Sequence, residues 1–77
     1  ILSYKVYPNP IEDALNINGE DLNATNIKLY NSLSQEINLS YIYSKNSLQL
    51  NTSALNKGVY ILVIEKDGEV FSYKLIK

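Results

Sequence analysis

Apolar and polar residues alternate along short segments throughout this 77-residue chain. Leu15 and Ile17 flank Asn16, for example, and the same pattern covers residues 47–51. A period of two sends successive side chains to opposite faces of a strand, so each segment has one face to bury. The pattern predicts seven short strands, over residues 4–6, 15–18, 27–29, 37–41, 47–51, 59–65 and 70–76, and the fourth ends either at Tyr41 or at Tyr43.

Seven short strands with no helix of useful length predict an all-β fold. We expect a seven-stranded immunoglobulin-like β-sandwich of antiparallel strands, forming a single domain over residues 1–77, with a small open barrel as the structural alternative. The intervening segments are rich in Asn, Asp, Ser and Gly, as turns require. One helical turn is predicted over 52–57, where Thr52 caps the N-terminus and Gly58 takes a left-handed conformation after the last turn.

The last two strands are predicted to form a hairpin of defined register. Asp67 and Gly68 favour a two-residue type I′ turn, because both central positions of that turn need positive φ. Lys66 then lies opposite Glu69, and one face carries only apolar and aromatic residues that are predicted to face the core: Tyr60, Leu62, Ile64, Phe71, Tyr73 and Leu75. The opposite face is half apolar. It is partly covered by a neighbouring strand or loop, or is a moderately apolar surface, or is a docking strip for a partner, formed by Val59, Ile61, Val63 and Ile76.

The residue types that this chain lacks exclude several classes of function. It has no His and no Cys, so it holds no Ser-His or Cys-His nucleophile pair and no disulfide. It has no Arg for bidentate contacts to phosphate or guanine, and its net charge of −1 is unlike the basic surface of a nucleic-acid binder. No apolar run approaches the length that spans a membrane. We therefore expect no cofactor, no bound nucleic acid and no membrane insertion.

Acidic and aromatic residues are the remaining candidates for chemistry. Four acids lie in predicted turns, where such residues are common, namely Glu12, Asp13, Glu20 and Asp21. The alternatives are a calcium site made of loop oxygens and a glycosidase-like carboxylate pair using Glu12 and Glu20. Four tyrosines offer a stacking surface for sugar rings or bases, although alternation places half of them in the core: Tyr4, Tyr7, Tyr41 and Tyr43. We expect no enzymatic activity, because so small a sandwich has little depth for a substrate cleft.

The segment Pro8-Asn9-Pro10 interrupts the chain after the first predicted strand. Neither proline has an amide donor, and Asn9 is pushed to an extended conformation because it precedes a proline. The result is a stiff corner that does not pair with a strand. The plain structural interpretation is that this corner stops an edge strand.

Three blocks of this sequence occur in the order of a known family. They are 6–10 with its Pro-Asn-Pro segment, 55–62 with Gly58 and Tyr60, and the basic end Lys74-Leu75-Ile76-Lys77. With them, and with a weaker block over 27–31, the chain resembles the type A C-terminal sorting domain of the type IX secretion system of the Bacteroidota. Ser34 stands where that family usually has a Gly in the turn after its third strand, which predicts a different or slightly strained turn.

The resemblance implies a non-catalytic function in export. Such a domain is the tail of a secreted enzyme or adhesin, and it directs its parent from the periplasm through the outer-membrane translocon, with its shuttle proteins, to the cell surface or the medium. A sortase-like cysteine peptidase then cuts the tail off. Carried over position by position, the recognition residues are Pro8, Asn9, Pro10, Gly58, Tyr60, Lys74 and Lys77. We hypothesise that Gly58 and Tyr60 position the final hairpin, whereas Lys74, Lys77 and the apolar strip are contacted directly.

The ends of the chain and its edges add further expectations. The start at Ile1 indicates a cut from a larger protein and the end at Lys77 a true C-terminus, so the domain is expected to be a C-terminal fragment. A weak homodimer through an unpaired edge strand is also expected. The alternative function is an immunoglobulin-like binding or spacer module of an extracellular enzyme, including a carbohydrate-binding one.

Overall fold

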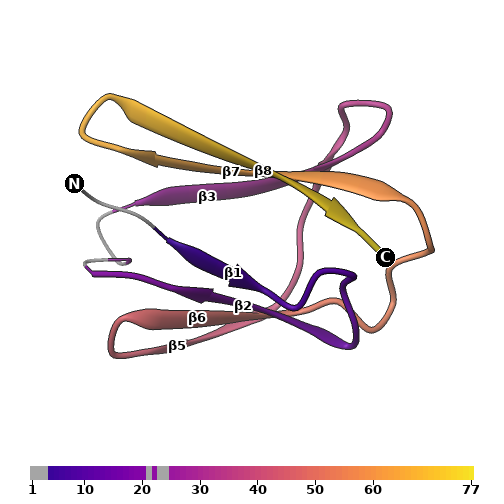
Figure 1. The fold of residues 1–77 in the computed structure, drawn as a ribbon, viewed down its shortest axis with the longest axis horizontal. Helices are drawn as coiled ribbons and strands as arrows, with labels where there is room; N and C mark the ends of the chain where they lie inside the picture. The colour runs from indigo at the N-terminus through magenta and orange to yellow at the C-terminus, as the bar shows by residue number, and fades with distance from the viewer. Residues whose placement is uncertain (1–3, 21, 23–24) are drawn as a thin grey trace.

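The computed structural model of the chain describes residues 4–20, 22 and 25–77 (Figure 1). Its strands are β1 (Lys5–Tyr7), β2 (Ala14–Asn18), β3 (Asn26–Asn31), β4 (Glu36–Ile37), β5 (Tyr41–Ser44), β6 (Ser47–Asn51), β7 (Val59–Lys66) and β8 (Glu69–Ile76). Neighbouring strands pair antiparallel throughout. Within the described ranges no helix is long and apolar enough to cross a membrane.

The strands form two four-stranded sheets that face each other as two layers (Figure 1). One sheet has the order β1-β2-β6-β5 and the other the order β4-β3-β7-β8. Alternate side chains of the central strands β2 and β7 are buried, and Leu15, Ile17, Leu62 and Ile64 are completely enclosed between the layers. The all-β antiparallel sandwich expected from the alternation is thus confirmed, but it has eight strands and not seven.

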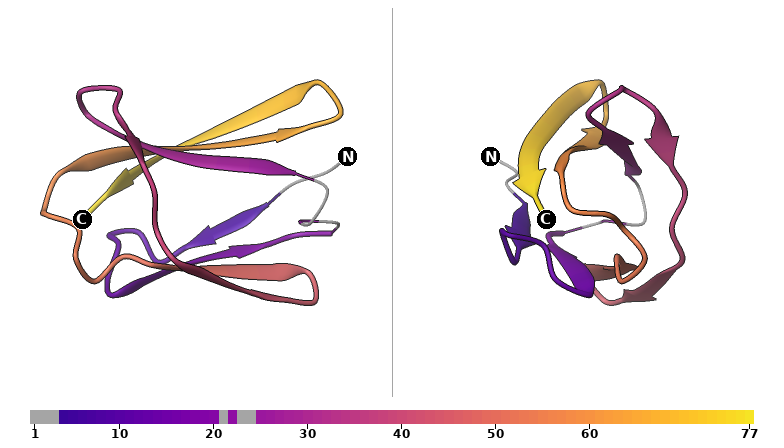
Figure 2. Two further views of the ribbon diagram at one scale, coloured as in Figure 1. Left: turned by 180° about the vertical axis from the view of Figure 1, so that it is seen from behind. Right: turned by 90° about the vertical axis from the view of Figure 1, so that its right-hand side faces the viewer.

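The additional strand arises because the predicted strand over 37–41 is divided between the two sheets. Ile37 pairs with Leu29 in one sheet, whereas Tyr41 pairs with Leu50 in the other. Residues 38–40 cross from one layer to the other (Figure 2). The two-residue period continues through the crossover, because Leu39 also packs against the core, and alternation therefore does not mark the point where the chain changes sheets.

The predicted register of the last hairpin is confirmed. Lys66 lies opposite Glu69, and Tyr60 lies opposite Leu75. Asp67 and Gly68 have φ angles of 52° and 81°, as a type I′ turn requires. The face predicted to be apolar is turned to the core, with Leu75 and the alternate residues of β7 buried.

Residues 52–57 form turns and not the predicted helical turn. The Leu55 N–H donates to the Thr52 carbonyl at 3.1 Å, which bends the segment without starting a helix. Gly58 does not take the predicted left-handed conformation, because its backbone pairs in both directions with Lys77 and continues the β7–β8 ladder by one step. With no helix to terminate, a left-handed residue is not needed at this point.

Candidate functional site

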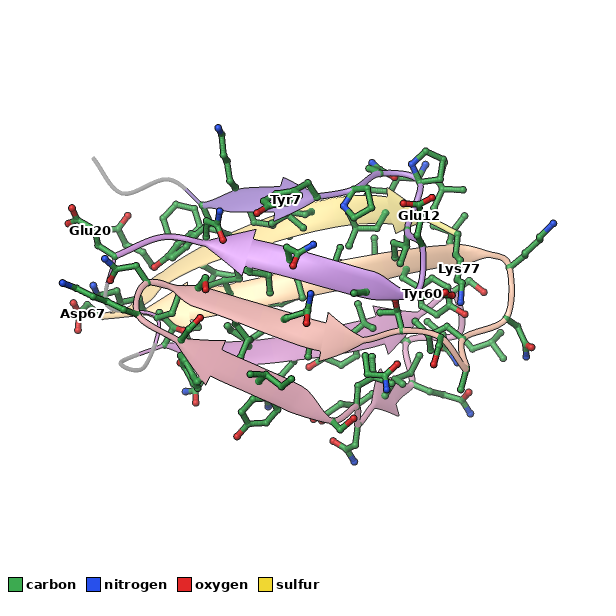
Figure 3. The ribbon with its side chains drawn as sticks, turned by 90° about the horizontal axis from the view of Figure 1, so that it is seen from below. Tyr7, Glu12, Glu20, Tyr60, Asp67 and Lys77 are labelled. Atoms are coloured by element: carbon green, nitrogen blue, oxygen red, sulfur yellow. The ribbon has the colours of Figure 1, made fainter. Side chains whose placement is uncertain are left out.

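The predicted recognition residues gather toward one end of the sandwich. They lie in three segments that begin or end there, 8–10 between β1 and β2, 58–60 at the start of β7 and 74–77 at the end of β8. Figure 3 shows Glu12, Tyr60 and Lys77 at this end of the molecule. We call five residues at this end the end cluster: Asn9, Thr52, Gly58, Tyr60 and Lys77.

Asn9 pairs with the outer edge of β8 through its side chain. Its Oδ1 accepts a hydrogen bond from the Ile76 N–H at 3.1 Å, and its Nδ2 donates to the Lys74 carbonyl at 3.5 Å. The Ile11 N–H donates to the Ile76 carbonyl at 2.6 Å. The side-chain amide thus takes the place of a peptide group of a neighbouring strand, while the flanking prolines have no N–H to offer. The Tyr7–Pro8 and Asn9–Pro10 peptide bonds are both cis.

Thr52 connects the Pro-Asn-Pro end of β2 to the segment before β7. Its side chain is completely buried, its Oγ1 donates to the Glu12 carbonyl at 2.6 Å, and its N–H donates to the Asp13 carbonyl at 3.0 Å. The prediction that this side chain caps a helix was therefore wrong, because the hydroxyl bonds to a distant carbonyl. Sequence reasoning did not find Thr52 as a site residue, and a single Thr between Asn51 and Ser53 has no pattern that would reveal it.

Lys77 joins the end of β8 to the same segment. Its Nζ donates to the Thr52 carbonyl at 2.5 Å and lies 3.4 Å from the Ser53 carbonyl. Its backbone N–H donates to the Gly58 carbonyl at 2.9 Å, and its carbonyl accepts from the Gly58 N–H at 3.1 Å. The ammonium group of Lys77 is thus turned onto backbone carbonyls, where a positive donor forms strong hydrogen bonds.

Lys74 and the apolar strip lie on the outer face of the final hairpin. Lys74 is exposed and sits opposite Ile61 in the ladder, as the predicted register requires. Val59 and Ile76 are 38% and 50% exposed, and Ile61 and Val63 are half-buried. The structure therefore keeps a basic side chain and an apolar strip together on one accessible face.

Tyr60 and Gly58 differ in their burial and in whether the fold requires the residue type found there. Tyr60 is buried on the core face, and its hydroxyl donates to the Asn56 carbonyl at 2.6 Å, which ties the 52–58 segment to the core. Gly58 is exposed, and a Cβ atom added there would meet no atom within 4 Å. Neither backbone conformation nor space inside the domain therefore requires a glycine at position 58.

The acidic candidates do not come together as a site. Glu12 and Asp13 are exposed at the end that holds Lys77, whereas Glu20 is exposed at the opposite end (Figure 3). Asp21 lies outside the described residues. In the part of the chain that the structure describes, no group of three or more acidic side chains is placed to hold a metal ion.

The four tyrosines considered as a stacking surface likewise do not form one surface. Tyr4 is buried against Phe71, with ring centroids 5.4 Å apart, while Tyr7 is exposed on β1. Tyr41 and Tyr43 are exposed on β5, where their rings meet edge to face at 6.0 Å. Partial burial raises the pKa of the Tyr43 phenol, and the neighbouring Tyr41 raises it further by charge repulsion.

Comparison with known families gives a match over nearly the whole chain. A family model described as the secretion system C-terminal sorting domain matches residues 5–77, which include all three blocks that meet at this end. No curated protein gives a significant match to the chain. Domains of this family signal export by type IX secretion, out of the cell and toward its surface, and they interact with the secretion machinery to do so. The chain belongs to the family of type IX secretion system C-terminal sorting domains.

Proposed function

We propose that this chain is a non-catalytic sorting signal that the type IX outer-membrane translocon and its shuttle proteins recognise in the folded state. It takes a parent protein from the periplasm across the outer membrane to the cell surface or the medium. A sortase-like cysteine peptidase then separates the domain from its parent.

The end cluster is the observation that carries this proposal. Segments from the beginning, the middle and the end of the chain are held together there by hydrogen bonds such as that from Thr52 to Glu12 and that from Ile76 to Asn9. A partner that contacts this end meets all three segments at once only when the domain is folded. The signal in this proposal is therefore a surface and not a linear peptide.

From these contacts we infer two groups among the predicted recognition residues. Tyr60 and Lys77 direct their polar atoms to backbone carbonyls, so their part is to position the surface. Asn9 has both parts, because its amide bonds to the β8 backbone while the residue stays exposed. Lys74 and Pro10 are exposed and accessible to a partner. This division assigns Lys77 to positioning, whereas the sequence alone suggested direct contact.

Gly58 belongs with the directly contacted residues. An added methyl group at position 58 would project into open space, so Gly58→Ala should leave the folded domain almost unchanged. A glycine that the fold does not require is useful where a partner approaches the backbone closely. Loss of export with an unchanged melting temperature would therefore report contact with the partner and not damage to the fold.

The test fuses residues 1–77 to a periplasmic reporter and measures how much of it reaches the surface or the medium. We expect export in cells with an intact translocon and none in cells without it. Lys74→Ala and Gly58→Ala should each reduce export, whereas Lys5→Ala, which changes an exposed lysine on β1 of the other sheet, should not. Export without the translocon would refute the proposed function, and equal effects of the two lysine changes would refute the assignment of Lys74.

The same fusion tests the cleavage step. A reporter that arrives outside the cell without the domain, and that retains it when the peptidase is absent, is the expected result. A reporter that always keeps the domain would instead favour an immunoglobulin-like binding or spacer module that remains part of the mature protein.

A further inference from the structure

The described part of the sandwich has four edge strands, and three of them are protected against pairing with a further strand. Asn9 and Ile11 occupy the outer edge of β8 at its Lys74–Ile76 end, and the strand carries two charges, Glu69 and Lys74. β1 has three residues and is followed by the Pro-Asn-Pro segment, and β4 has two residues, one of them the charged Glu36. Short length, prolines and charges are the usual means by which proteins protect strand edges.

The fourth edge strand, β5, is also short, with four residues, but it has neither a charge nor a proline. Its Tyr41, Ile42 and Tyr43 are 60%, 68% and 43% exposed. A strand with exposed aromatic and β-branched residues and no charge is well suited to pair with a further strand.

The orientation of the β5 backbone defines which groups are available for pairing. The Asn51 N–H donates to the Ser40 carbonyl at 2.9 Å, so Ser40 and then every second residue along β5 direct their backbone groups to β6. The N–H and C=O groups of Tyr41 and Tyr43 consequently point away from the sheet. These are the groups that a strand added at this edge would use.

We propose that a second copy of this chain pairs with β5 through an antiparallel, two-fold symmetric contact centred on Ile42. Tyr41 of each copy then lies opposite Tyr43 of the other, and all of their outward N–H and C=O groups form hydrogen bonds. On the outer face of the sheet, the Ile42 side chains of the two copies lie opposite each other at the two-fold axis. Lys45, the nearest charge, lies opposite Leu39, so the register brings no like charges together. This self-complementarity is what identifies a second copy as the occupant.

A cavity beside β5 supports the same arrangement. It has a volume of about 200 Å³ and is lined by Tyr41 and Tyr43, by apolar side chains of both sheets that include Ile27 and Leu48, and by polar residues that include Lys28 and Glu36. Residues opposite each other in a strand pair share one face of the sheet. Tyr41 and Tyr43 of the second copy therefore lie on the same face of the sheet as this cavity, and they cover part of its lining.

The contact uses one four-residue strand from each copy, so the interface is smaller than the roughly 1,000 Å² that a stable complex buries. We expect a reversible dimer with a dissociation constant on the order of 0.1–1 mM. The dimer is a property of the isolated chain and does not depend on the proposed role in export.

Sedimentation equilibrium over a concentration series up to about 2 mM, chosen to exceed this dissociation constant, tests the proposal. The average mass of the unchanged chain should rise toward twice that of a single chain. Ile42→Lys should remain monomeric, because it places two like charges at the two-fold axis. Val70→Lys is the matched control, since Val70 is 61% exposed on the β8 edge, and it should associate like the unchanged chain. Circular dichroism checks that both variants are folded.

Nuclear magnetic resonance locates the contact. The amide signals of Tyr41 and Tyr43 should shift with concentration, and those of β8 should not. A chain that stays monomeric throughout, equal effects of the two substitutions, or shifts confined to another strand would each overturn the proposal. If Ile42→Lys reduced export of the reporter while the unchanged chain stayed monomeric, the occupant of this edge would be a component of the export machinery and not a second copy.

Discussion

Replacing Thr52 by Val removes one hydroxyl from the centre of the end cluster and keeps the volume of the side chain. The hydroxyl is completely buried and donates to the Glu12 carbonyl at 2.6 Å, so the substitution leaves that carbonyl without this donor. Loss of one partner of a buried hydrogen bond costs about 1–3 kcal/mol. The isosteric methyl group creates no cavity and recovers a little free energy by its own burial, so we expect a net loss of about 1–2 kcal/mol in the free energy of unfolding.

This loss corresponds to a decrease of about 4–16 °C in the melting temperature of a domain of this size. Thermal and chemical unfolding of Thr52→Val measure it, and Ser44→Ala is the control, because the Ser44 hydroxyl bonds to Ser47 at the exposed turn between β5 and β6. The control should change stability by less than about 0.5 kcal/mol. A Thr52→Val variant as stable as Ser44→Ala would show that the bond to Glu12 does not hold the end cluster together.

Three further substitutions test other parts of the structure. Ser34 has a φ of 61°, and Ser34→Gly should raise the free energy of unfolding by about 0.5–1 kcal/mol, because relief of left-handed strain outweighs the added flexibility of glycine; a loss of stability in denaturant titrations would contradict this. Tyr60→Phe removes the bond to Asn56 and should cost about 0.5–1.5 kcal/mol in the same assay, and no change would argue against a positioning role. Because the pKa of Tyr43 is raised, its neutral form favours the folded state, and stability should fall as the pH rises above about 10, the ordinary tyrosine value. Tyr43→Phe should remove that part of the decrease, and an unaltered pH profile would refute the assignment.

Hydrogen bonds in the end cluster bring together sequence segments that are far apart in the chain, so that these segments form one surface. Asn9 and Ile76 are separated by 67 residues, and Thr52 and Glu12 by 40. The bond between Asn9 and Ile76 connects the two sheets, and the bond between Thr52 and Glu12 connects the segments beside β6 and β2 of one sheet, at the same end of the sandwich. A substitution in any one block is therefore expected to disturb the presentation of the others, which suits a signal that is recognised as a folded body.

The sequence by itself determined the features that depend on local pattern. The two-residue period predicted an all-β sandwich, and Asp67-Gly68 predicted the turn and register of the last hairpin, including the burial of Tyr60. These predictions succeeded because alternation and turn chemistry act between near neighbours in the chain.

Only the tertiary structure decided the features that depend on contacts between distant segments. The crossover at 38–40 continues the same alternation on both sides, so the division into β4 and β5 depends on which sheet offers a partner strand. Thr52 and Lys77 acquire their roles from backbone carbonyls that are remote in sequence, and Gly58 is extended because it pairs with Lys77. Every residue has a backbone carbonyl, whatever its side chain. The sequence pattern therefore cannot predict which carbonyl will accept a hydrogen bond from a buried hydroxyl or an ammonium group.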